Sequence, residues 1–161
     1  MNKFLIISFW LLIVTGCKEE SPKLTFERQT YNGKELRMDG FYYSVSSNFE
    51  GPLYNIFFYY RSGIYRYAGS SNDSTHFEQE GWLNPNSRLI WGLFKVDGQQ
   101  ILREQWTPED SWIHRGTILN DTTFQINELQ SSSGSVVRFK DDVFHFVEFS
   151  PKPDSITKYI E

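Results

Sequence analysis

The stretch Arg88–Trp106 reads RLIWGLFKVDGQQILREQW and decides the fold of this chain. Apolar side chains alternate with others along both sides of Asp97-Gly98, which is the period of a β-strand. An Asp-Gly pair between two such runs is the strongest short signal of a β-hairpin, because both residues tolerate a positive φ. The stretch therefore predicts a hairpin in which Leu89–Val96 pairs with Gln99–Trp106.

Further hairpins are predicted on both sides of this one. Residues 53–60 and 64–67 alternate around a turn at 61–63, and residues 111–129 predict a hairpin about Asn120-Asp121. Residues 135–149 predict another hairpin. The remaining expectations are a turn of that last hairpin at Lys140-Asp141-Asp142, strands at 24–29 and 35–46, a short helix at 75–80, and a helical turn or a strand at 155–161.

The number and spacing of these strands predict an all-β domain. Eight or nine strands joined by short turns form an antiparallel meander, and aromatic residues, which favour β-sheets, make up 17% of the chain. Closing a meander removes exposed sheet edges, and about eight strands leave an interior for side chains or one small ligand. We therefore expect a closed barrel, with a β-sandwich as the alternative because it shares the same strand signals.

A different pattern occupies the N-terminus. A basic residue precedes the apolar run Phe4–Val14, which is shorter than the roughly 20 residues of a membrane-spanning helix but has the length of the apolar region of a secretory signal. The single cysteine of the chain, Cys17, follows shortly after this run. The sequence thus divides into a signal peptide at 1–16, a tether at 17–35 and one domain at 36–161.

Residues Val14-Thr15-Gly16-Cys17 resemble the lipobox of bacterial lipoproteins. The resemblance implies that a lipid is attached to the thiol of Cys17 and that cleavage leaves this cysteine at the new N-terminus. Acyl chains hold a protein on a membrane with about 0.8 kcal/mol for each buried CH₂. A lipidated Cys17 would leave no free thiol for a disulfide or for catalysis.

The residues after the cysteine, Lys18-Glu19-Glu20, resemble the surface-export signal of lipoproteins from Bacteroidota. This second resemblance implies an outer-membrane lipoprotein of the cell envelope whose domain faces outward. A polar tether without a sorting role is the alternative.

The order Trp91-Gly92, Phe94, an Asp-Gly turn and then Gly116-Thr117-Ile118 resembles the lipocalin-like barrels found among Bacteroidota lipoproteins of unassigned role. The resemblance extends over residues 36–149. It implies the same closed barrel that the strand pattern predicts.

Composition and spacing give no sign of nucleic-acid, metal or catalytic chemistry. The chain has 16 Lys+Arg and 20 Asp+Glu without a basic cluster, so no nucleic-acid partner is expected. His76, His114 and His145 lack the spacing of a zinc site. No Gly-x-Ser-x-Gly elbow, phosphate loop or distinguishable pair of carboxylates occurs. We therefore expect no metal, no cofactor and no enzymatic activity.

Aromatic residues and arginines within strands are the remaining candidates for a binding site. Aromatic side chains line ligand-holding barrels, and an arginine that points inward needs a partner or an anionic ligand. For Arg103, the outer face of the barrel is the favoured position. The candidate ligand-binding residues are Tyr60, Trp91, Trp106, Trp112 and Arg115.

Two functions fit these observations best. The first is a membrane-tethered module that binds a small apolar or amphipathic ligand or a glycan inside its barrel. The second is a structural lipoprotein with a filled barrel that docks on a protein of the cell envelope through an exposed apolar patch. An enzyme ranks third because no group of catalytic residues is recognisable.

Overall fold

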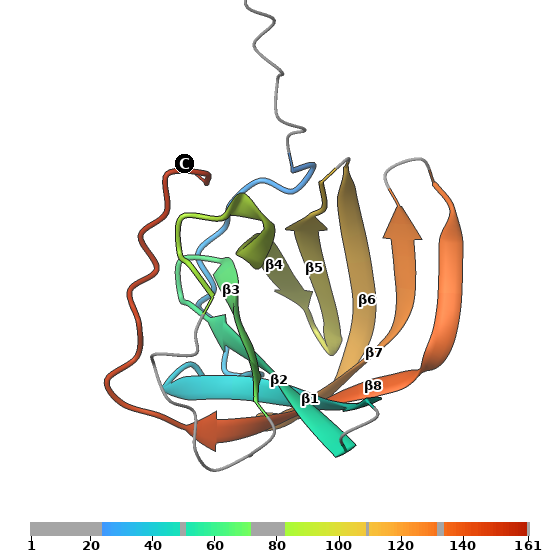
Figure 1. The fold of residues 1–161 in the computed structure, drawn as a ribbon, viewed down its shortest axis with the longest axis horizontal. Coiled ribbons are helices and arrows are strands. Elements are labelled where there is room, and N and C mark those ends of the chain that lie inside the picture. The colour runs from blue at the N-terminus through green and yellow to red at the C-terminus, as the bar shows by residue number, and fades with distance from the viewer. Residues whose placement is uncertain (1–23, 49–50, 72–82, 109, 132–133, 161) are drawn as a thin grey trace, which may run out of the picture.

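The computed structural model describes residues 24–48, 51–71, 83–108, 110–131 and 134–160. Within them the chain forms eight β-strands and a short 3₁₀ helix at Arg88–Ile90 (Figure 1). The strands are β1 Gly40–Asn48, β2 Gly51–Tyr59, β3 Ile64–Ser71, β4 Trp91–Asp97, β5 Gln100–Trp106, β6 Ser111–Asn120, β7 Thr123–Ser131 and β8 Val136–Glu148.

The strands form one closed antiparallel barrel. Each strand pairs with its neighbours in chain order, and the ring closes where β1 pairs with β8, with Tyr42 opposite Phe146 and Ser44 opposite Phe144. This continuous ring confirms the predicted all-β meander and its closed, lipocalin-like architecture. It excludes the β-sandwich, whose two sheets would not be joined into one ring.

The three tight hairpin turns are confirmed. Asp97 pairs with Gln100 across the Asp-Gly turn, where Gly98 has a φ of 56°, a conformation that glycine adopts without a steric cost. The turn about Asn120 joins β6 to β7, and the turn at residues 61–63 joins β2 to β3. These turns lie between strands that are adjacent in sequence, so the local pattern is enough to predict them.

Three local predictions are wrong, and a fourth lies outside the described residues. Residues 136–148 form one long strand rather than a hairpin, because β8 must pair with β7 along its first part and with β1 along its second. Residues 24–29 are not a strand, and residues 155–160 form neither a helix nor a strand. The helix expected at 75–80 falls in the undescribed part.

One half of the barrel interior is filled by aromatic rings. The rings of Phe124 and Phe144 stack with centroids 4.6 Å apart, and Tyr59 meets the rings of Tyr42 and Phe94 edge to face. Such pairs add about 0.5–1.5 kcal/mol each beyond the burial of their area. This end of the barrel is therefore a packed core.

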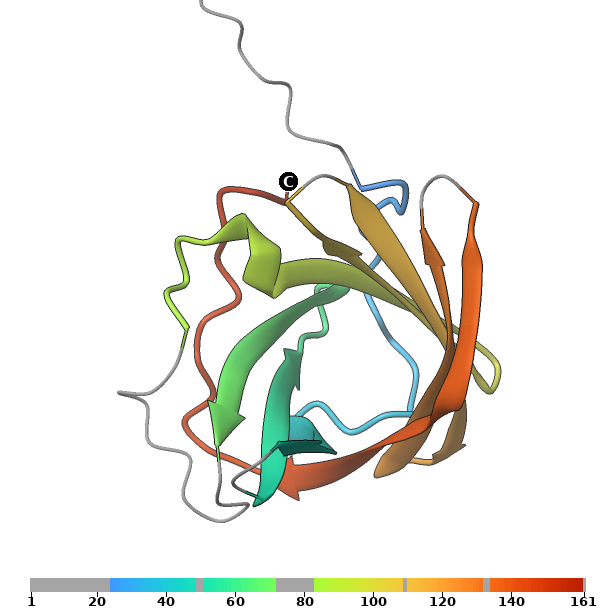
Figure 2. The same ribbon diagram turned by 45° about the vertical axis from the view of Figure 1, so that its right-hand side comes forward.

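The N-terminal segment, residues 24–39, closes the same end. The backbone N–H of Tyr31 donates to the carbonyl of Arg61 at 2.8 Å, and that of Arg37 donates to the carbonyl of Asp121 at 3.0 Å. Figure 2 shows the segment crossing behind the barrel before it enters β1. We call this end of the barrel the closed end.

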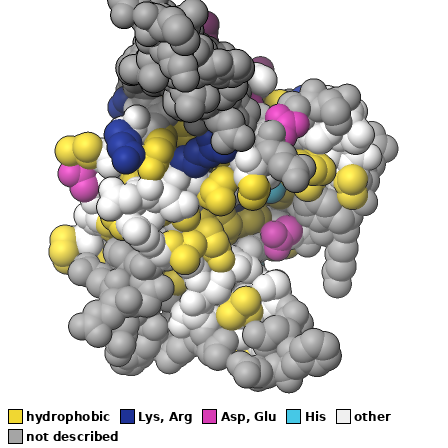
Figure 3. All heavy atoms as spheres, turned by 45° about the horizontal axis from the view of Figure 1, so that its top comes forward, with side chains coloured by type: hydrophobic (Ala, Val, Ile, Leu, Met, Phe, Trp, Pro, Cys, Tyr) yellow, Lys and Arg dark blue, Asp and Glu magenta, His cyan; other side chains and the backbone are white. Residues whose placement is uncertain are grey.

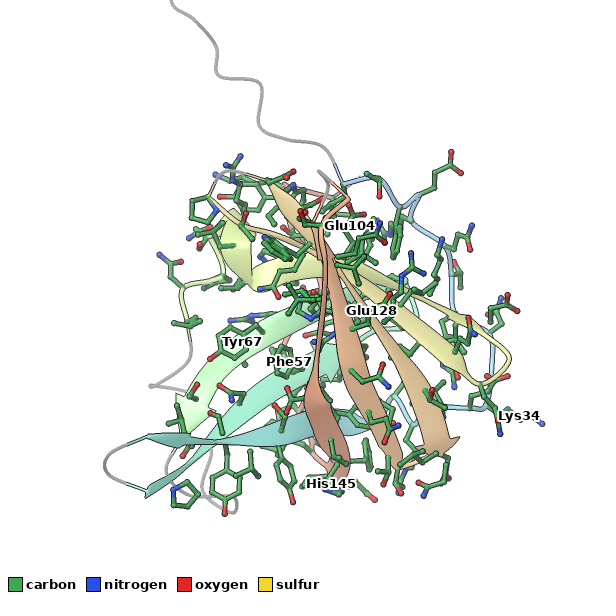
Figure 4. The ribbon with its side chains drawn as sticks, turned by 90° about the vertical axis from the view of Figure 1, so that its right-hand side faces the viewer. Lys34, Phe57, Tyr67, Glu104, Glu128 and His145 are labelled. Carbon is green, nitrogen blue, oxygen red and sulfur yellow. The ribbon has the colours of Figure 1, made fainter. Side chains whose placement is uncertain are left out.

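A buried carboxylate fixes the start of the N-terminal segment. Glu104 on β5 points outward and is fully buried, and it accepts hydrogen bonds from the backbone N–H groups of Thr25 and Phe26 at 2.8 and 2.7 Å. It also accepts hydrogen bonds from the hydroxyls of Thr25 and Ser111. Glu104 lies close to the point where the described chain begins (Figure 4). Residues 24–35, which the sequence assigned to the tether, thus contact the barrel.

The C-terminal segment, residues 149–160, covers part of the outer face. Lys152 donates to the carbonyl of Met38 at 2.8 Å, and its ammonium lies 4.5 Å from the centre of the Tyr60 ring. Ile160 is 8% exposed and belongs to the hydrophobic cluster on the outside of β2, β3 and β4. The domain therefore has two hydrophobic layers, one inside the barrel and one beneath its terminal segments.

Candidate functional site

The two ends of the barrel differ in how they are lined. The end of β1, the start of β2 and the corresponding ends of β3 to β8 lie opposite the closed end, at an end that we call the mouth. Strand alternation turns several half-buried or exposed side chains inward near the mouth. These mouth residues are Ser46, Asn55, Tyr67, Ser70, Gln105, Trp112, His114, Leu129 and Asp142.

Figure 3 shows hydrophobic side chains gathered across the middle of one face of the molecule, with histidine and acidic side chains beside them. The mouth residues have the same mixture of aromatic, polar and charged groups. Binding sites for small molecules combine an apolar lining with a few polar groups that orient the ligand. The mouth half of the interior is therefore the candidate functional site.

A hydrogen-bonded cluster holds one side of the mouth in place. Asn55 accepts hydrogen bonds from Tyr67 at 3.2 Å and from Ser70 at 2.8 Å, and its amide donates to Ser46 at 3.1 Å. Phe57 on β2 and Tyr67 on β3 lie side by side, with ring centroids 5.0 Å apart (Figure 4). These polar and aromatic groups are oriented before any ligand arrives, which lowers the entropy cost of binding.

Arg103 lies between the mouth residues and the packed aromatic half. It is 3% exposed, and its guanidinium donates to the hydroxyl of Tyr59 at 3.0 Å and contacts Nδ1 of His114 at 3.3 Å. Its carbon Cζ lies 4.7 Å from the ring centre of Phe144 and 5.0 Å from that of Phe57. A cation is thus buried among aromatic faces, which attract it electrostatically.

Burial and the charge of Arg103 govern the titration of its neighbours. Burial, and then Arg103, lowers the pKa of His114 to about 3, so His114 is neutral at physiological pH. Burial raises the pKa of Asp142, although Arg103 and a hydrogen bond from Ser44 work against this rise. Arg103 is therefore the principal charge within this half of the interior.

The sequence-predicted residues divide between the two faces of the barrel. Trp112 is a mouth residue. Tyr60, Trp91 and Trp106 lie in the outer hydrophobic cluster, which the C-terminal segment covers, so they are not brought together with Trp112. Arg115 points outward and pairs with Glu128 at 3.3 Å. Cys17 lies outside the described residues.

Arg103, His114 and Asp142 were missed as site residues. The sequence favoured the outer face for Arg103, but the structure places it inside. Its strand neighbour Ile101 is fully buried on the same face, and Gln105 is half-buried there. Because alternate residues of a strand share a face, Ile101 and Arg103 lie on the same side of β5. The apolar Ile101 is thus the one signal in the sequence for an inward Arg103.

Other kinds of site are scarcely represented in the described ranges. Those residues contain no cluster of three His, Cys, Asp or Glu side chains able to hold a metal ion. A cavity of about 170 Å³ lies beside the closed end, where Tyr31, Glu35 and Lys95 are among the lining residues. Within the same ranges, no helix is long and apolar enough to span a membrane.

No protein-family model matches this chain, and comparisons with curated proteins and with solved structures find no significant similarity. Function must therefore be argued from the geometry of the barrel itself.

Proposed function

We propose that this protein is a membrane-tethered binding protein that holds one small apolar or amphipathic ligand in the mouth half of its barrel. The observation that carries the proposal is the contrast between the two ends. The closed end is packed with aromatic rings and covered by the N-terminal segment, whereas inward-facing residues at the mouth remain half-buried or exposed. A filled barrel that served only as a scaffold would need no such difference.

The chemistry of the mouth favours an amphipathic ligand. Trp112 and Leu129 supply apolar surface, while Asn55 and Ser70 supply hydrogen-bonding groups on the opposite side. A purely apolar ligand would keep water from these polar groups and leave their remaining hydrogen-bonding capacity unused, which is costly. A ligand with one polar part and one apolar part satisfies both sides.

The expected lipid on Cys17 adds a source for such a ligand. Six residues lie between Cys17 and Leu24, the first described residue, and the seven steps from one to the other span at most about 25 Å. Lipidation would thus keep the barrel close to a membrane surface, where amphiphiles accumulate. The proposal includes this outer-membrane location, with display on the outer surface of the cell envelope.

Titration with a neutral fluorophore tests the binding function. The chain from Lys18 to Glu161, which contains every described contact of the barrel, is titrated with N-phenyl-1-naphthylamine, whose emission rises in apolar surroundings. Saturable binding is expected. The variant Ser46→Trp places a bulky ring inside the mouth and is expected to weaken binding by about tenfold or more.

The matched control is Val45→Trp. Val45 is the preceding residue of β1, points outward and is 47% exposed, so its replacement should leave the affinity unchanged. Absence of saturable binding, or equal effects of both variants, would contradict the proposal. Retention of an envelope protein by the immobilised barrel without any bound fluorophore would support the docking role instead.

A further inference from the structure

The buried guanidinium of Arg103 lacks a full set of partners. Among the described residues, only Tyr59 and His114 make hydrogen-bond contacts with it, and its Nε is buried without a partner there. No carboxylate among the described residues forms an ion pair with it. Arg103 therefore differs from Arg115 on the outer face, which pairs with Glu128.

A buried guanidinium with too few hydrogen-bond acceptors lowers the stability of the fold unless another group interacts with it. A buried charge is tolerated when it is paired and hydrogen-bonded, and an arginine presents five N–H donors in a planar fork. Here the aromatic faces of Phe57, Tyr65 and Phe144 stabilise the cation, but they accept none of its in-plane N–H groups. Part of the donor fork, including Nε, therefore has no acceptor among the described residues.

The nearest acid does not fill this role. Asp142 is close enough for its charge to act on Arg103, yet it accepts a hydrogen bond from Ser44 and forms no ion pair with Arg103. His114 accepts at Nδ1 as a neutral ring and brings no negative charge. Among the described residues, therefore, no carboxylate lies within ion-pair distance of this buried guanidinium, although the charge of Asp142 acts on it from farther away.

We infer that the ligand carries a carboxylate head group and that Arg103 binds this group inside the barrel. This inference rests on the proposed binding function and names the class of ligand. A carboxylate matches the planar fork of a guanidinium with two parallel N–H···O bonds, which a hydroxyl or an amide does not.

The position of Arg103 also fixes the orientation of the ligand. Beyond Arg103, toward the closed end, the interior is packed with the rings of Tyr42, Phe94 and Phe124. Toward the mouth lie the half-buried side chains of Trp112 and Leu129. The head group therefore lies in the middle of the barrel, and the apolar tail runs toward the mouth along Trp112 and Leu129, on the side away from the hydrogen-bonded cluster of Asn55.

Competition between two amphiphiles of equal chain length tests the inference. Dodecanoate and 1-dodecanol are used to displace N-phenyl-1-naphthylamine from the chain Lys18–Glu161, at about pH 8 so that the carboxylic acid is ionised. Dodecanoate is expected to compete about tenfold or more better than the alcohol. Arg103→Met should abolish this preference, which is the ratio of the two competition constants and is compared at whatever affinity for the fluorophore the variant keeps. Arg103→Lys should keep only part of the preference because a lysine has no planar fork.

The matched control is Arg115→Met, which removes an arginine from the outer face and should keep the full preference. Equal competition by both amphiphiles in the unmodified protein would overturn the inference, even if Arg103→Met failed to fold. A preference that persists in Arg103→Met, or that Arg115→Met also abolishes, would overturn it as well. Failure of the fluorophore itself to bind would instead refute the proposed binding function.

Discussion

Arg103 and His114 face each other from β5 and β6, and this contact determines the charge of the histidine. The two residues are direct partners in the strand register, and the guanidinium contacts Nδ1 of the ring at 3.3 Å. A protonated ring would place two positive charges side by side at a point where burial shields both groups from solvent. His114 is therefore a neutral acceptor, and its proton lies on Nε2.

This contact predicts a specific loss of stability in acid. His114 has a pKa of about 3 in the folded protein, against an ordinary value of 6.5, so the unfolded chain binds more protons between these pH values. The free energy of unfolding should therefore decrease as the pH falls below about 6.5. His114→Gln keeps an acceptor for Arg103 but takes up no proton, so its stability should decrease less.

Urea unfolding at about pH 7 and about pH 4.5 measures this difference, since the remaining groups, including Asp142, titrate in both proteins. Parallel losses of stability in the two proteins would show that His114 is not held neutral by its surroundings.

The residues around Arg103 also show which parts of this site could be predicted from the sequence. Trp112, which the sequence named as a candidate ligand-binding residue, points inward. Arg103 was expected on the outer face because charged residues are rarely buried. Its inward position depends on three aromatic rings from β2, β3 and β8, which come together only when the barrel closes.

The C-terminal segment behaves as an integral element although it contains no helix or strand. It ends with Ile160, which is 8% exposed in the outer cluster, whereas Ile156 of the same segment is 81% exposed. Ile160→Ala should lower the free energy of unfolding by about 2 kcal/mol or more, because a buried isoleucine leaves a cavity. Ile156→Ala should leave it nearly unchanged.

Urea unfolding at neutral pH measures both isoleucine variants, and each serves as the control for the other. Equal stability of the two variants would mean that the end of the chain is not packed on the barrel.

The sequence predicted strands correctly where the partner strand follows closely along the chain. The predictions failed where the partner is distant in sequence. The hairpin at Asp97-Gly98 is fixed by its own residues. By contrast, Asp142 was read as part of a turn, yet it lies within β8 and faces the interior near Arg103. In the sequence alone, an aspartate indicates a turn. Its place within a strand becomes understandable only when Arg103 is known to face it from β5. The strand predicted at residues 24–29 is wrong for a related reason. The backbone N–H groups of Thr25 and Phe26 donate to the side chain of Glu104, which is distant in sequence.

The whole molecule is a sheet without an open edge. Because β1 pairs with both β2 and β8, hydrogen exchange at amides in residues 40–46 and 142–148 should be as slow as in residues 101–106 of β5. Hydrogen–deuterium exchange with mass spectrometry measures all three stretches together. Fast exchange in either β1 or β8 alone would reveal an open seam and argue against a closed barrel.

The hydrogen bonds between Glu104 and the start of the N-terminal segment also determine how the barrel responds to force. A pull on the N-terminus reaches the protein first at Thr25 and Phe26, whose N–H groups are held by Glu104 on the wall strand β5. Neighbouring strands β4 and β6 brace that wall on both sides. The load therefore passes into the sheet before it reaches Tyr31 and the cover over the closed end. Glu104 thus protects the packed core from a pull on the N-terminus, because the wall strand β5 takes up the load first.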